Sequence, residues 1–176
     1  MSVNSPLLPI ERFLQTLRLV FREGNHLLYS YGRLYSQPVD AVWVQGLDVN
    51  PELAERLEAF ISRFGRMQDT IADKLLPRWL LALAERPGSQ IETLNRAERL
   101  GVVNNVENWL EARKLHNRLV HEYMEDAEAF AEDLVLAREY SIMLLDTFNR
   151  LHNFVAKRME IEEATLPGLI ALPEQD

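Results

Sequence analysis

The chain has 176 residues, of which 47% are hydrophobic and 26% charged, a balance that predicts one globular domain with a full core. It contains no cysteine, which excludes disulfides, zinc–thiolate sites and thiol nucleophiles. Its net charge of −8 argues against general nucleic-acid binding, because phosphate-binding surfaces are basic. An RNA-binding role therefore needs a local basic patch. The alternative is that the acidic surface binds a basic protein partner.

The first predicted helix begins near Pro9, a residue favoured in the first turn, and its apolar residues keep helical spacing as far as Tyr31. Gly24 and Asn25 interrupt the spacing, which predicts a bend at that point. The following segment, SQPVDAVWVQGLDVN (36–50), has no helical period. We therefore predict a connection there, long for a helical bundle and hence a candidate for a partner contact.

The second predicted helix has the clearest start. Asn50 can cap it and Pro51 suits its first turn. An apolar stripe then runs from Leu53 to Leu83. Pro77 lies inside this stripe, where it removes a backbone donor and clashes with the preceding turn, so we predict a kink or a break there.

Two further helices begin at capping motifs. Ser89 and Glu92 form a capping box at the start of a short helix. Asn104 and Glu107 mark the next start in the same way, and the apolar positions carry that helix to about Tyr123.

The last predicted helix is the long one from near Asp126 to about Arg158. The tail, residues 161–176, contains two prolines and no period, and we expect it to be loosely ordered. The chain is therefore predicted to be all-α, an up-and-down four-helix bundle with one additional short helix over residues 1–160. No apolar run reaches the roughly 18 residues of a membrane span, and no signal peptide is evident, so we expect a cytoplasmic protein without membrane contact.

The residues with chemical potential lie in EARKLHNRLVHEYMED (111–126), a basic helix in an acidic chain. Arg113, Asn117 and His121 are four residues apart and line one side of it. His116 and Arg118 project in other directions from the same helix. This helix is therefore the candidate site of function.

Three strings, RFGRMQDTIADKLLP, NRAERLGVV and WLEARKLHNRLVHEY, resemble the nucleotidyltransferase-associated branch of the HEPN superfamily, over roughly residues 10–160. The most specific part is NRLVHEY (117–123). The motif of the family is an arginine, a short spacer and a histidine, followed in one branch by any residue and a tyrosine. His121 and Tyr123 match this motif, whereas His116 stands where the arginine is expected.

The resemblance implies one of two functions. Some members are metal-independent ribonuclease toxins, which a small nucleotidyltransferase antitoxin silences by attaching AMP to the motif tyrosine, here Tyr123. Others are non-catalytic substrate-binding or docking partners of nucleotidyltransferases. The family also implies a homodimer whose motif helices face each other across a shared cleft, and it implies no cofactor.

RNA cleavage by a 2′-hydroxyl needs proton transfer and positive charge on the phosphate. His121 would transfer the proton, because an imidazole titrates near neutrality. His116 would donate a hydrogen bond to the phosphate, Arg113 or Arg118 would supply the positive charge, and Asn117 is a further candidate on the same helix. An arginine keeps its charge at every relevant pH, and removal of one such donor commonly lowers a rate by about 10²–10³-fold.

Each of these residues also has a structural interpretation. His121 can interact with the helix dipole, and Tyr123 can be an ordinary boundary aromatic. Arg113, Lys114 and Arg118 can form a solvated face paired with Glu107, Glu111 and Glu122.

The string RFGRMQDT contains two further candidate residues. Arg66 could supply charge beside the motif helix, and Asp69 could bind one of its arginines. The acid pairs Glu125–Asp126 and Glu132–Asp133 are adjacent, which does not suit a helix-bundle metal site, and we predict no metal.

Overall fold

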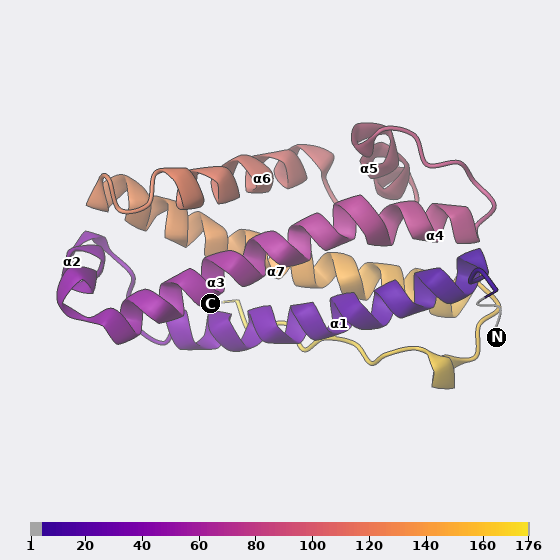
Figure 1. Ribbon diagram of the computed structural model, residues 1–176, viewed down its shortest axis with the longest axis horizontal. Coiled ribbons are helices and arrows are strands. Elements are labelled where there is room, and N and C mark those ends of the chain that lie inside the picture. Colours follow the sequence, from indigo (N-terminus) through magenta and orange to yellow (C-terminus); the bar gives the residue numbers. More distant parts are fainter. Residues whose placement is uncertain (1–4, 176) are drawn as a thin grey trace.

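The computed structural model describes residues 5–175, and it confirms the all-α prediction: 75% of these residues are helical, and none of them is in a strand. Helix α1 (Pro9–Leu34) packs on α3 (Pro51–Thr70), on α4 (Leu76–Ala82) and on α7 (Ala127–Arg158). Helix α6 (Val106–His121) closes the arrangement by packing on α7 and α3 (Figure 1). In residues 5–175 no helix has the length and apolar character that a membrane crossing requires.

The prediction that residues 36–50 form a connection without a helix is wrong. It contains a short helix, α2 (Ala41–Gln45), and a 3₁₀ turn, η1 (Gly46–Val49). The carboxylate of Asp40 caps α2 by accepting from the Trp43 N–H at 2.8 Å, and the side chains of Val44 and Leu47 are buried. A helix shorter than two turns shows no period in sequence, which is why α2 was not predicted. Because α2 exists, α5 (Gln90–Arg99) is not the single short helix that the sequence predicted.

Several predicted boundaries are confirmed. Helix α1 begins at Pro9, α7 ends at Arg158, and Asn50 caps α3 by accepting from the Leu53 N–H at 3.2 Å. Ser89 and its capping-box partner both make their bonds at the start of α5.

The boundaries of α6 differ from the prediction at both ends. Asn105, not Asn104, is the cap, and a carboxylate oxygen of Glu98 in α5 accepts the first helical N–H at 2.7 Å. The helix ends at His121, two residues before the predicted end at Tyr123. Met124 adopts a φ of 60°, and this left-handed residue turns the chain toward α7.

Pro77 does not break the second long helix. A π turn, η2 (Ile71–Leu75), connects α3 to α4 immediately before it. A wider turn accommodates a missing donor and the bulk of the proline ring without ending the helix. Likewise, α1 runs uninterrupted through Gly24 and Asn25.

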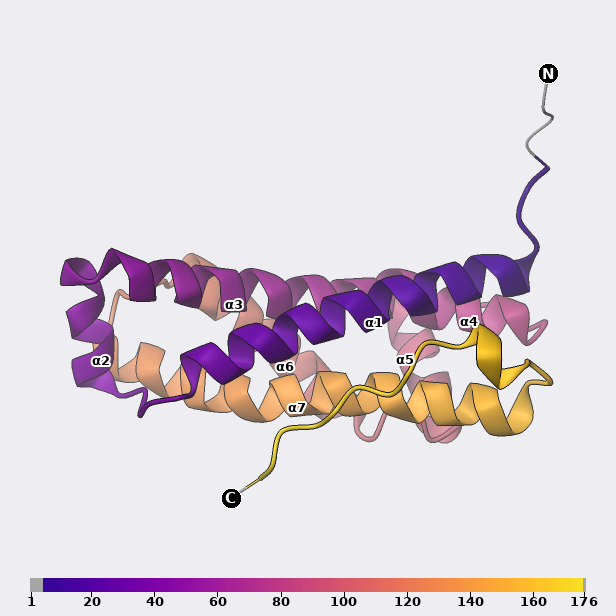
Figure 2. The ribbon, with the colours of Figure 1, turned by 90° about the horizontal axis from the view of Figure 1, so that it is seen from below.

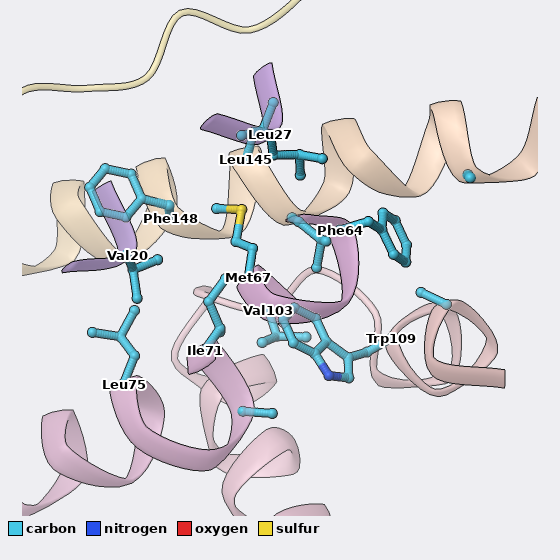
Figure 3. Close-up of a cluster of buried hydrophobic side chains, with 14 of the residues drawn as sticks. Val20, Leu27, Phe64, Met67, Ile71, Leu75, Val103, Trp109, Leu145 and Phe148 are labelled. Carbon is cyan, nitrogen blue, oxygen red and sulfur yellow. The ribbon is translucent and has the colours of Figure 1, made fainter. Parts of the chain in front are cut away.

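The core follows the buried stripe of α3 and η2. Figure 3 shows Met67 and Ile71 next to side chains of α1 (Val20, Leu27) and of α7 (Leu145, Phe148), with Trp109 of α6 in the same cluster. The amide of Gln68, which is only 2% exposed, donates to the carbonyl of Trp109 at 3.1 Å. This bond joins α3 to α6 beside the candidate site.

The tail beyond α7 makes specific contacts instead of the loose arrangement that we expected. It contains a 3₁₀ turn, η3 (Glu163–Thr165), and runs back along α1 and α7 (Figure 2). The side chain of Ile170 is 2% exposed, and both backbone polar groups of this residue bond to Asn149 of α7.

We expect Gln68→Ala to lower the free energy of unfolding by about 2 kcal/mol, because it removes a buried hydrogen bond and leaves a cavity between α3 and α6. Urea denaturation followed by circular dichroism measures this change. Gln15→Ala, at an exposed position of α1, is the control and should change stability by less than about 0.5 kcal/mol. Equal stability of the two variants would show that the Gln68 bond does not join the helices.

Candidate functional site

A groove of about 590 Å³ lies between α3 and α6, and we call it the α3/α6 groove. Its walls are residues at helical spacing, so one face of each helix borders it. The α3 wall is formed by Glu58, Ile61, Ser62, Gly65, Arg66 and Asp69. The opposite wall is formed by His116, Leu119 and Val120 of α6, with Tyr123 just beyond that helix.

His116 of α6 is half-buried, and its ring contacts α3. Its ring stacks on Phe64, with 6.2 Å between the ring centroids and 28° between the planes. The ring also lies directly over Gly65, where a Cβ would overlap the imidazole. Burial lowers the pKa of His116, and the nearby carboxylate of Asp69 opposes this only in part. The imidazole is therefore largely neutral at pH 7.

Tyr123 is the second predicted site residue on the groove. Its ring packs edge-on against Phe130 of α7, at 5.4 Å between centroids. Burial raises the pKa of the Tyr123 phenol, and the carboxylates of Glu58 and Asp48 raise it further. The phenol is therefore a protonated hydrogen-bonding group at neutral pH.

The two arginines of the motif helix bond to other helices. Arg113 donates to the side chain of Gln90 in α5. Arg118 makes two bonds to the carboxylate of Asp133 in α7, at 2.9 and 3.1 Å. Neither arginine is among the residues that line the groove. The predicted pairing with carboxylates of the same segment is confirmed for Lys114, which lies 3.1 Å from Glu111, but it is wrong for Arg118, whose partner is on α7.

Arg66 is the arginine that does line the groove, and its side chain is exposed. Asp69, one turn further along α3, lies on the same wall. The predicted ion pair between Asp69 and an arginine of the motif helix is absent, since Asp69 makes no ion pair within residues 5–175. Its charge acts instead on His116.

Asn117 and His121 lie outside the set of residues that line the groove, and both are exposed. His121 is in the last turn of α6, where a positive charge interacts favourably with the helix dipole. It remains near enough for its charge to lower the pKa of His116. Of the six predicted site residues, the structure therefore places His116 and Tyr123 together on the groove.

Apart from Arg66 and Asp69, the residues of the α3 wall were not predicted from the sequence as part of a site. Gly65 was the available indication, since a glycine inside a helical stripe commonly marks a close packing contact. Within residues 5–175 no three histidine or acidic side chains cluster in a way that could hold a metal ion. No protein family, curated protein or solved structure matches this chain.

Gly65→Ala should raise the pKa of His116 toward its ordinary value, because the added methyl group displaces the ring from its buried position into solvent. An NMR titration of the imidazole protons measures this pKa. Gly32→Ala is the matched control, since a Cβ at Gly32 meets nothing within 4 Å. It should leave the pKa unchanged and stabilise α1 by about 0.5–1 kcal/mol. An unchanged His116 pKa in Gly65→Ala would contradict the described packing.

Proposed function

We propose that this chain is a HEPN-like component of a nucleotidyltransferase two-component system, in which it serves as a non-catalytic substrate-binding or docking partner. One observation carries the choice of a non-catalytic role. The arginines of the motif helix bond to Gln90 and Asp133, and His116, which replaces the motif arginine, is a largely neutral side chain. Neither arginine of the helix therefore directs its charge at a phosphate beside His121, as RNA cleavage requires.

The composition of the α3/α6 groove supports binding. Ile61, Leu119 and Val120 give it apolar walls, and Arg66 adds one permanent positive charge. His116 offers a hydrogen-bonding group without charge. Concave, mostly apolar sites with a few polar groups are typical of ligand-binding pockets, and the volume of the groove lies in their usual range.

The proposed partner is a small nucleotidyltransferase encoded beside this chain and present with it in the cytoplasm. The chain carries a net charge of −8, which favours a basic partner surface. We include a homodimer in the proposal, with the α6 helices of two subunits near a shared cleft, since two-fold contacts are the commonest in soluble oligomers. Tyr123 would be the acceptor if the partner transfers AMP.

Val120→Glu should weaken the complex with this nucleotidyltransferase by about tenfold or more, because it buries a charge in an apolar contact. Isothermal titration calorimetry of the purified proteins measures the affinity. Val135→Glu is the matched control: Val135 on α7 is 51% exposed, Val120 is 47% exposed, and only Val120 lines the groove. Equal affinities for the two variants would place the docking surface elsewhere.

A ribonuclease is the second candidate, and Arg66 favours it, because this arginine brings permanent charge to the groove that contains His116.

Under the non-catalytic proposal, we expect the wild-type chain to leave RNA uncleaved, with or without a chelator. His116→Arg should gain activity because it restores the charge beside His121. An assay with labelled RNA measures the cleavage.

The ribonuclease candidate predicts a different pattern. Wild-type protein would then cleave RNA, His121→Ala would lower the rate by about 10²–10⁴-fold, and Arg66→Ala by about 10²–10³-fold. Arg99→Ala, at an exposed position of α5, would leave the rate unchanged. Such a pattern would overturn the non-catalytic proposal.

A further inference from the structure

The tail of the chain binds the helices in the manner of an extended peptide ligand. Residues 166–171 form no helix or strand, and they follow the seam between α1 and α7 (Figure 2). Pro167 fixes its own backbone angle and has no N–H, which keeps this segment from joining a helix. The backbone groups of residues 166–171 therefore depend on side chains of the helices for hydrogen bonds.

Side chains of α7 hold the backbone of the tail at two residues. The amide of Asn149 donates to the carbonyl of Ile170 at 2.8 Å, and its oxygen accepts from the N–H of the same residue at 2.9 Å. A neighbouring strand would satisfy both groups of one residue in the same way. Nε2 of His152 lies 2.7 Å from the carbonyl of Pro167, so it donates there.

One side chain anchors the tail. Ile170 is 2% exposed, whereas Leu169 beside it is 54% exposed. The hole that receives Ile170 exists because α1 has a glycine at position 24, where a Cβ would overlap the isoleucine side chain. A Cβ at that position would also lie 3.1 Å from Met67 and 3.5 Å from Leu145, so these two side chains lie beside the same position.

From these contacts we infer that the α1/α7 seam is a binding site for an extended apolar peptide, recognised by Asn149, His152 and the hole over Gly24. Residues 166–171 of the same chain occupy the site, and the same segment of a second copy can replace them. The site uses the α7 side chains Asn149 and His152, neither of which lines the α3/α6 groove, and does not depend on the proposed function. A single buried side chain and a few hydrogen bonds make the segment separable from the helices.

The test uses the full chain carrying Ile170→Asp, which releases the tail and leaves the site intact. A fluorescently labelled peptide of residues 162–175 should bind this variant saturably. Its affinity for the wild-type chain should be lower by a factor of about 100 or more, because the tethered tail competes at a high effective concentration. Adding Asn149→Leu to the variant should weaken binding at least about tenfold.

Two controls isolate the anchor. Leu169→Asp changes the exposed neighbour, so its tail stays docked and the labelled peptide should bind as weakly as to wild type. The peptide that itself carries Ile170→Asp should not bind any variant. If Ile170→Asp keeps its helical circular dichroism spectrum but does not bind the wild-type peptide, the inference is overturned.

A second form of the experiment covers the case in which Ile170→Asp fails to fold. A protease site is inserted between Glu162 and Glu163, both of which are exposed, and the folded protein is then cleaved. The released peptide should dissociate on dilution and bind again on concentration. Unfolding of the helices after cleavage, or a tail that never dissociates, would show that the segment is an inseparable part of the core.

Discussion

The close approach of α3 and α6 at Gly65 determines what the groove between them can do. Because position 65 has no side chain, the imidazole of His116 lies flat against α3 and stacks on Phe64. That position removes the ring from water, and burial favours its neutral form. A neutral ring can donate or accept a hydrogen bond, but it cannot replace the fixed charge of an arginine. The packing that forms the groove thus also keeps this ring largely uncharged.

The distribution of ion pairs acts in the same direction. Arg118 is held by Asp133, and the pair is partly exposed, so it contributes little to stability. The pair instead fixes the orientation of the Arg118 side chain, since two bonds to Asp133 hold its guanidinium against α7. Arg66 has no carboxylate partner within 4.0 Å in the described chain, and it is the permanent positive charge that the groove retains.

The sequence predicts what is periodic and local. The long helices and the caps at Asn50 and Ser89 follow from apolar spacing and from side chains that bond within one turn. The start of α6 was misplaced by one residue because two asparagines are adjacent, and the choice between them involves Glu98 from another helix. In the same way, the sequence places His116 on a helix, but the wall opposite comes from a distant part of the chain.

Glycines inside helices are the most useful sequence feature for predicting such long-range contacts. A helical glycine costs about 1 kcal/mol relative to alanine, so its presence in a stable helix suggests a packing reason. Gly24 and Gly65 lie on buried helix faces, and each receives a side chain from elsewhere, Ile170 in one case and His116 in the other. Gly32 lies on an exposed face and has nothing near it. The interruption at Gly24 that suggested a bend in α1 therefore marks the binding hole for the tail, and burial of the helix face distinguishes the informative glycines from the incidental one.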